Sequence, residues 1–224
     1  MCRMIVALGK INIGKLLDDI KIVAQGLNEL NEKNKKKGMY THGEGWGIAY
    51  IKKTRWHLYK SDKAIYEDSM LDELKKLKCR AVVIHTRHRT IGERSIENTQ
   101  PLKFSTKDGD FIFAHNGTIF DDMQVYHHYI KGNSDSVKMF NNILYAYAHD
   151  KQSFTVKDYT AVNFILVSKK HIQVAQKYKM NPKYSTMKLL KNKEMVIVSS
   201  EVLPSYKKQD WKELKNNSML EFDV

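Results

Sequence analysis

Short runs of β-branched and aromatic residues recur along this 224-residue chain, and they constrain its fold more than any other feature. Each run is bounded by Gly, Asn, Asp or Lys, which is typical of strands separated by turns. The predicted strands cover residues 1–8, 45–53, 55–60, 80–88, 110–119, 163–169, 171–178, 186–192, 194–201 and 218–224. The number and shortness of these segments predict β-sheets as the main framework.

Apolar residues at helical spacing fall between the strands. The longest such stretch runs from about Ile13 to Asn34, and Gly38 is a plausible cap for it. Further helices are expected over residues 69–78, 121–130 and 134–150, the last beginning at Ser134 and Asp135, residue types that favour a helix start. Strands and helices do not alternate regularly, which predicts an α+β fold with antiparallel sheets.

The chain has three prolines and no visible repeat or low-complexity linker, so residues 1–224 are expected to form a single domain. Nothing resembles a membrane span or a signal peptide, and we expect a cytoplasmic protein. Cys2 and Cys79 are too few for a disulfide framework and lack the neighbours of a metal site. We therefore expect no metal and no cofactor, and Cys79 as a small buried apolar residue.

The net charge of +13 is the one feature that favours a nucleic-acid partner. Only six of the 38 basic residues are Arg, however, and the lysines are scattered over the whole length. Proteins that contact bases and phosphates rely strongly on the planar fork of Arg. The composition therefore favours a Lys-rich solvated surface, which can still attract an acidic partner or an anionic substrate.

Cys2 directly follows the initiator methionine. If Met1 is removed, the Cys2 thiol and a free α-amine stand on one residue. An α-amine titrates at about 7.7–8.0, so it can accept the thiol proton directly or through one water. The alternative is an ordinary buried cysteine in a strand, and position alone does not decide between the two.

Asn116 and Gly117 end the expected strand at residues 110–119. Asn-Gly is a strong signal for a hairpin turn. The same pair can also form an oxyanion hole, with the Asn amide and the Gly backbone N–H directed at one point. Glycine would allow the close approach and the unusual dihedral angles that such a site needs.

Arg87 lies just past an apolar strand, and Asp135 lies at the start of a predicted helix. Each has a structural interpretation: Arg87 as a rim residue bridging to an acid, and Asp135 as an N-terminal cap. Together they can also bind an α-amino acid, with Arg87 on the carboxylate and Asp135 on the ammonium.

These segments resemble one family when they are taken in order. Cys2, "GEGWGIAY", "HTRHRTIG", "ENTQPL", "FAHNGTI", "SDS" and "VSSE" together are similar to the class II glutamine amidotransferases of the N-terminal-nucleophile hydrolase superfamily. The resemblance extends from Cys2 to about Glu201. It implies a four-layer αββα sandwich of two antiparallel sheets.

The resemblance also implies roles for six residues. Cys2 would be the nucleophile and supply its own α-amine as the base, and Asn116 and Gly117 would form the oxyanion hole. Arg87, with help from Thr90, would bind the α-carboxylate of glutamine, and Asp135 its α-ammonium.

The sequence departs from the family pattern at three places. Glu44 replaces a common Asp in a segment expected to be scaffold. Val137 replaces a common Glu after "SDS", and His88 and Arg89 replace small residues after Arg87.

Three functions remain open at this stage. The first is a glutaminase subunit that releases ammonia for a separate synthase. The second is a free-standing hydrolase of γ-glutamyl amides, the branch that "HGEGWGIAY" resembles most. The third is an inactive basic module with a binding or regulatory role, for which RNA is one partner, although the intact site residues and the scarcity of Arg disfavour it.

Overall fold

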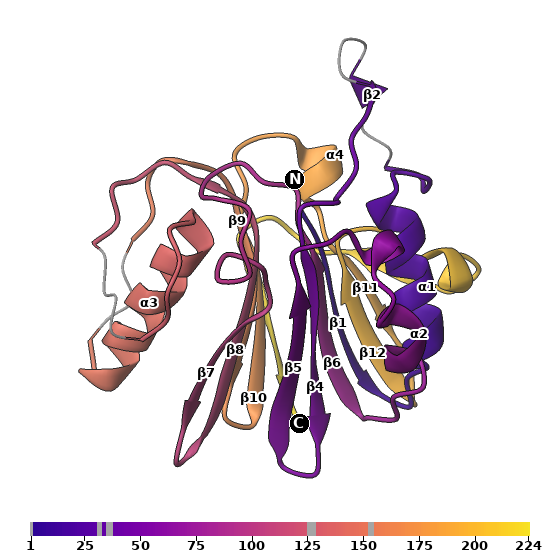
Figure 1. The fold of residues 1–224 in the computed structure, drawn as a ribbon, viewed down its shortest axis with the longest axis horizontal. Helices are drawn as coiled ribbons and strands as arrows, with labels where there is room; N and C mark the ends of the chain where they lie inside the picture. Colours follow the sequence, from indigo (N-terminus) through magenta and orange to yellow (C-terminus); the bar gives the residue numbers. More distant parts are fainter. Residues whose placement is uncertain (1, 31–32, 35–37, 125–128, 152–154) are drawn as a thin grey trace.

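The structure is a computed structural model that describes residues 2–30, 33–34, 38–124, 129–151 and 155–224. Two antiparallel sheets stack face to face, and helices cover the outer side of each sheet (Figure 1). The order of layers is therefore helix, sheet, sheet, helix. This is the αββα sandwich that the family resemblance implies.

The first sheet has seven strands in the order β13-β11-β12-β1-β6-β4-β5. The bounds are β1 Arg3–Gly9, β4 Trp46–Lys52, β5 Arg55–Ser61, β6 Ala81–Thr86, β11 Lys188–Lys191, β12 Met195–Ser199 and β13 Trp211–Glu213. Strand β1 lies in the middle, between β12 and β6. The N-terminus of the chain is thereby held by two neighbouring strands, which fixes the position of Cys2.

The second sheet has five strands in the order β14-β10-β9-β8-β7. The bounds are β7 Leu102–Thr106, β8 Gly109–Ile119, β9 Tyr159–Ser168, β10 His171–Gln176 and β14 Ser218–Asp223. A separate short hairpin joins β2, Lys33–Asn34, to β3, Gly38–Met39. The sequence pattern missed β7 and β13, and β13 forms by pairing with β11.

Alternating residues of each strand separate the core into layers, because successive side chains of a strand point to opposite faces. In β1, Met4 and Val6 face the second sheet, whereas Ile5 and Ala7 pack beneath a helix. In β8, Ile112 and Ala114 face the first sheet. The central strands of each sheet are thus buried on both faces, which explains why β1 and β6 are almost continuously apolar. The edge strands β5 and β14 have exposed positions and carry polar residues there.

The longer helices supply the outer layers, while the other helical segments are short. Helix α1, Ile13–Ala24, packs on the first sheet, and α3, Asp135–Ala148, packs on the second. The remaining helical segments are η1 Ile65–Glu67, α2 Leu71–Leu74, α4 Pro182–Ser185 and η2 Pro204–Tyr206. The sequence analysis correctly placed the start of α3, where the Ser134 hydroxyl accepts the Val137 N–H at 3.3 Å.

Two helix predictions were wrong in length. Helix α1 ends at Ala24 rather than near Asn34, because Gly26 adopts a positive φ of 72°. Leu27, counted as an apolar helix position, is consequently 60% exposed. The helix expected over residues 69–78 is the four-residue α2. Of the helix expected over 121–130, residues 125–128 lie outside the described residues, and the described ends are not helical.

Candidate active site

Four residues that the sequence analysis singled out meet at one end of the sandwich. Cys2 precedes β1, Arg87 follows β6, Asn116 lies near the end of β8, and Asp135 begins α3. By strand alternation Cys2 lies on the same face of β1 as Met4 and Val6, and Asn116 on the same face of β8 as Ile112 and Ala114. Both therefore face the space between the sheets.

The Cys2 thiol is 9% exposed and donates to the carbonyl of His88 at 3.4 Å. Burial raises the pKa of this thiol, since a thiolate is poorly solvated there. The hydrogen bond with the backbone of His88 and the positive charge of Arg87 act in the opposite direction. A nucleophilic role for Cys2 therefore requires a base close to its sulfur.

Asn116 and Gly117 do not form the hairpin turn that an Asn-Gly pair often makes. They lie within β8, paired with Asn163 and Val162 of β9, and a register shift follows Gly117. Gly117 has a φ of 141°, and a Cβ placed on it would lie 1.8 Å from the Ala161 carbonyl oxygen. Only glycine fits at this position.

Arg87 is 3% exposed, and it braces the loop that follows it. Its two terminal nitrogens donate to the carbonyl oxygens of Glu93 at 2.8 Å and Ile91 at 3.2 Å. Each terminal nitrogen carries two N–H groups, so these bonds leave donors for a carboxylate. The charge of Arg87 acts on both Cys2 and Asp135.

Asp135 and Thr90 are held by the end of β8. One carboxylate oxygen of Asp135 accepts the Ile119 N–H at 2.9 Å, and the residue is 5% exposed. The Thr118 hydroxyl donates to the Thr90 hydroxyl at 3.1 Å, and Thr90 itself is exposed. The segment from Asn116 to Ile119 thus connects the candidate oxyanion hole to the side chains of Asp135 and Thr90.

Two buried histidines lie beside the site, and burial disfavours the charged form of each. Burial lowers the pKa of His85 to about 3 and also lowers the pKa of His115. His115 Nδ1 lies 2.9 Å from the hydroxyl of Ser136 in α3, which also accepts from Gln100. These contacts fasten the start of α3 to β8. His127 and His128, also left without a role by the sequence, lie outside the described residues.

Two of the departures from the family pattern compensate for each other. The Glu44 carboxylate accepts the backbone N–H of Arg89 at 2.7 Å and forms an ion pair with its side chain at 3.2 Å. The charge that Arg89 adds near the site is thereby balanced by Glu44. The third departure, Val137, is buried in the core beneath α3.

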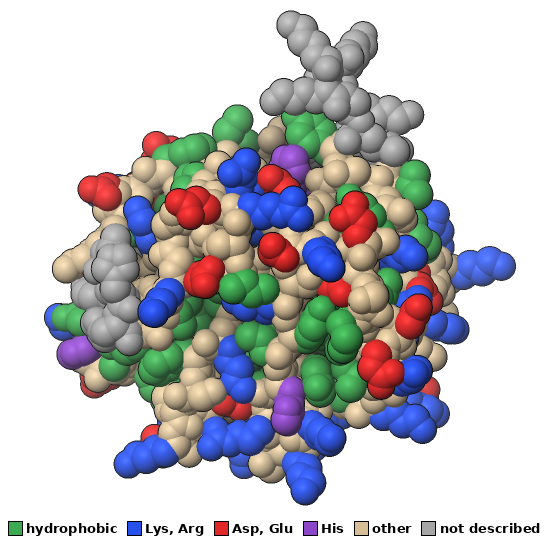
Figure 2. Space-filling view, viewed as in Figure 1, with side chains coloured by type: hydrophobic (Ala, Val, Ile, Leu, Met, Phe, Trp, Pro, Cys, Tyr) green, Lys and Arg blue, Asp and Glu red, His purple; other side chains and the backbone are tan. Residues whose placement is uncertain are grey.

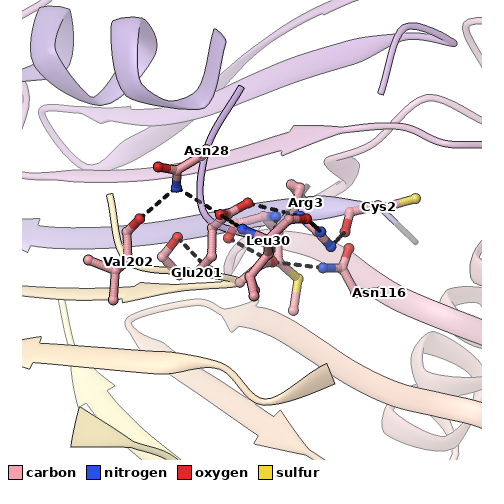
Figure 3. Close-up of polar contacts among 10 residues, drawn as sticks. Cys2, Arg3, Asn28, Leu30, Asn116, Glu201 and Val202 are labelled. Atoms are coloured by element: carbon pink, nitrogen blue, oxygen red, sulfur yellow. Dashed lines mark hydrogen bonds and ion pairs between the residues drawn. The ribbon is translucent and has the colours of Figure 1, made fainter. Parts of the chain in front are cut away.

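On the opposite face of β1 the sequence analysis missed a second polar group, the helix-side cluster of Arg3, Asn28 and Glu201 (Figure 3). Arg3 and Glu201 form a buried ion pair at 3.2 Å, with side chains 1% and 3% exposed. Asn28 donates to the second oxygen of Glu201 at 2.7 Å, and Arg3 also donates to the Cys2 carbonyl at 3.4 Å. An Arg in an otherwise apolar strand was the available signal for this cluster.

The rest of the described chain offers no competing site with the same chemistry. It holds no group of three or more His, Cys, Asp or Glu side chains able to bind a metal ion. A cleft of about 700 Å³ lies at the far end of β1, around Lys10, Lys75 and Cys79. Two of its lysines are paired with acids, Lys10 with Glu194 at 3.1 Å and Lys75 with Asp18 at 2.6 Å.

Two further features of the described chain concern the distribution of charge on its surface and the character of its helices. On the face drawn in Figure 2, Lys and Arg are spread over the surface with Asp and Glu among them. This distribution agrees with a solvated Lys-rich surface on that face. Among the described helices, none has both the length and the apolar character that crossing a membrane requires.

Cys2 and Cys79 are both free thiols, and burial raises the pKa of Cys79 to about 11.

Comparison with known proteins finds relatives in sequence and solved structures with a similar fold. A putative glutamine amidotransferase of Haemophilus influenzae is 29% identical over 103 residues, covering 44% of this chain and 35% of that protein. Glutamine phosphoribosylpyrophosphate amidotransferase of Bacillus subtilis superimposes with a TM-score of 0.65 at 20% identity, over 99% of this chain and 47% of that one.

A glutamine aminotransferase class-II domain protein of Silicibacter pomeroyi superimposes with a TM-score of 0.58 at 14% identity, over 100% of this chain and 95% of that one. The chain covers only about a third of the curated relatives that it matches. The family model of the class II glutamine amidotransferases matches residues 28–181, which is more than half of the chain. This protein therefore belongs to the class II glutamine amidotransferases.

Proposed function

We propose that this protein hydrolyses the γ-amide of glutamine through a γ-glutamyl thioester on Cys2. The observation that carries the proposal is that the charges of Arg87 and Asp135 act on the Cys2 thiol. Strand alternation in β8 also directs Asn116 into the space between the sheets, as it does Ile112 and Ala114. A nucleophile, an amide donor and two opposite charges are the groups that a site needs in order to bind and hydrolyse a small zwitterionic amide.

The first half of the reaction forms the thioester. After removal of Met1, the α-amine of Cys2 takes the thiol proton, and the thiolate attacks the γ-carbonyl carbon of glutamine. The amine then returns the proton to the departing nitrogen, so that the C–N bond breaks and ammonia leaves. A thiol whose pKa is raised by burial makes this neighbouring base necessary.

The second half releases glutamate. Water attacks the thioester carbonyl, the α-amine accepts its proton, and the C–S bond breaks to restore the thiol. In both halves a negative oxygen forms and receives hydrogen bonds from the Asn116 amide and the Gly117 N–H. The positive φ of Gly117 and the proximity of the Ala161 carbonyl fix the backbone at that point.

Substrate selection follows from the two charges beside the thiol. Arg87 would bind the α-carboxylate of glutamine, with Thr90 beside it, and Asp135 would bind the α-ammonium. The buried ends of both side chains are already held by the backbone, which reduces the entropy lost on binding. The ammonia released would serve a separate synthase protein.

The test is an assay of purified protein with glutamine and with γ-glutamyl peptides, each with and without proteins that co-purify from native cells. We expect glutamate release from glutamine that rises when the partner is added. Equal or better hydrolysis of γ-glutamyl peptides without a partner would instead identify a free-standing hydrolase. Salt-sensitive RNA binding without hydrolysis of either substrate would contradict an enzymatic role.

Processing is tested separately by intact mass spectrometry of the active protein. We expect Met1 to be absent, because the proposed base is the α-amine of Cys2. Active enzyme that fully retains Met1 would contradict that base. An electrophilic glutamine analogue should label Cys2 and spare Cys79.

A further inference from the structure

The contact between Asn116 and Ser200 joins the two sheets at the active site. Ser200 directly follows β12, and its hydroxyl accepts from Asn116 Nδ2 at 2.8 Å. The same hydroxyl accepts the Met4 N–H at 2.9 Å and lies 3.3 Å from the Met4 carbonyl oxygen. Figure 3 shows the nitrogen of Asn116 directed into this contact. Asn116 is thus the one predicted site residue that is bonded directly to the opposite sheet.

This arrangement leaves one buried atom of Asn116 unsatisfied. The residue is 4% exposed, and its Oδ1 has no hydrogen-bond partner among the described residues. A buried amide oxygen without a donor is destabilising. Moreover, an amide whose nitrogen is bonded to Ser200 turns its oxygen, an acceptor, to its other side. An acceptor cannot stabilise the negative oxygen that forms during amide hydrolysis.

Rotation of the amide by 180° about its last side-chain bond gives Oδ1 a donor and leaves Nδ2, in place of Oδ1, to be satisfied by the substrate. A hydroxyl can donate as well as accept, so Ser200 can donate to Asn116 Oδ1 across the same contact. The Met4 N–H keeps its bond to the Ser200 hydroxyl, and the Met4 carbonyl keeps the Ser200 backbone N–H at 3.0 Å. Apart from Asn116 Nδ2 itself, no group is left without a partner, and Nδ2 becomes free to donate on the side away from Ser200.

We propose that Ser200 is a positioning residue, whose hydroxyl selects the Asn116 orientation in which Nδ2 faces the reacting carbonyl. The inference rests on the proposed function, in which Asn116 supplies the oxyanion hole. Ser200 acts through Asn116 and does not touch the substrate. A positioning role for Ser200 also gives a function to the "VSSE" segment at residues 198–201, to which the sequence analysis assigned none.

The test compares Ser200→Ala with Ser199→Ala, because the two serines are adjacent and both are buried. Ser199 points to the other face of the strand, where its hydroxyl accepts only from the Glu201 N–H at 3.5 Å. We expect Ser200→Ala to lower kcat for glutamine about 10- to 100-fold with KM changed less than threefold. Ser199→Ala should stay within about threefold of wild type in both constants. Equal kcat values for the two variants would overturn the proposal.

A double-mutant cycle separates positioning from a general structural effect. If Ser200 acts through Asn116, the variant Asn116→Ala/Ser200→Ala should be no slower than Asn116→Ala alone. Multiplication of the two rate losses would overturn the proposal. A wild-type kcat for Asn116→Ala would instead show that the oxyanion role itself is wrong, which is a failure of the proposed function.

A second pair of variants covers the case in which Ser200→Ala does not fold. Ser200→Thr and Ser200→Val have the same shape but differ in the hydroxyl. We expect Ser200→Thr to be at least tenfold faster than Ser200→Val, both in glutamate release and in labelling of Cys2 by an electrophilic glutamine analogue. Equal rates in the two variants would overturn the role of the hydroxyl.

Discussion

The two faces of β1 carry polar clusters of opposite character. The site-side cluster of Cys2, Asn116 and Ser200 lies on the inner face of β1, where Asn116 of the second sheet contacts Ser200. Burial raises the thiol pKa there, and the Asn116 oxygen lacks a partner among the described residues. In the helix-side cluster, the Arg3–Glu201 pair lies among further hydrogen bonds from Asn28 and to the Leu30 carbonyl.

The difference distinguishes a cluster that stabilises the fold from a cluster that is available for the reaction. A buried ion pair with its remaining polar atoms satisfied keeps one geometry, which suits a support for the strand that carries Cys2. A buried thiol and an amide with an unused atom have capacity left for a ligand. We therefore expect changes in the site-side cluster to affect turnover and changes in the helix-side cluster to affect stability.

The largest effect is expected for Cys2→Ala. Removing a nucleophile costs on the order of 10⁴- to 10⁶-fold in kcat. The free energy of unfolding should change by less than about 1 kcal/mol, because the thiol makes one hydrogen bond. Glutamate release and urea unfolding measure the two quantities. Cys79→Ala is the control and should keep full activity; an active Cys2→Ala variant would exclude Cys2 as the nucleophile.

Breaking the ion pair of the helix-side cluster should show the reverse pattern. Arg3→Met leaves the Glu201 carboxylate buried without its partner, and such a loss costs about 3–5 kcal/mol of unfolding free energy. The double variant Arg3→Met/Glu201→Leu removes both charges and should regain most of the loss in urea unfolding. Per folded molecule, kcat should fall less than about tenfold. A loss of turnover with unchanged stability would remove the contrast between the two clusters.

Asn116→Ala tests the site-side cluster without touching the nucleophile. Loss of one oxyanion donor lowers kcat by about 10²–10³-fold. The matched control is Asn163→Ala, because Asn163 pairs with Asn116 across the strands but bonds to the Ser185 carbonyl and the Lys177 N–H. We expect the control to lose stability and to retain kcat, as measured by thermal melting and steady-state kinetics. Similar kcat values for the two variants would contradict the role of Asn116.

The smallest expected effect concerns pH and the two buried histidines. Burial lowers the pKa of His85 from 6.5 to about 3, so the unfolded chain binds this proton first as the pH falls. The contribution of the neutral His85 to the free energy of unfolding is fully present above pH 6.5. It is lost as the pH falls toward 3, at about 1.4 kcal/mol per pH unit. Urea unfolding between pH 7 and 4 should show a shallower slope for His85→Asn than for wild type. Identical slopes would mean that His85 is not held neutral by burial.

Local patterns in the sequence were sufficient for most of the framework. Short runs of β-branched and aromatic residues predicted β1, β4, β6 and β8, because the preference of such residues for strands is a local property. Ser134 and Asp135 predicted the start of α3 for the same reason, since a helix cap involves residues only three positions apart. The order of the short motifs also pointed to the family that the comparisons show.

What local patterns did not contain is the pairing of residues far apart in the chain. Ser200 meets Asn116 across 84 positions, and Arg3 meets Glu201 across 198. Strand β13 likewise forms by pairing with β11. The end of α1, in contrast, follows from the positive φ of Gly26, close to it in the chain. The sequence by itself determined which residues can do chemistry, through their types and local spacing. Only the tertiary structure decided which of them meet, because stacking two sheets is what places Ser200 against Asn116.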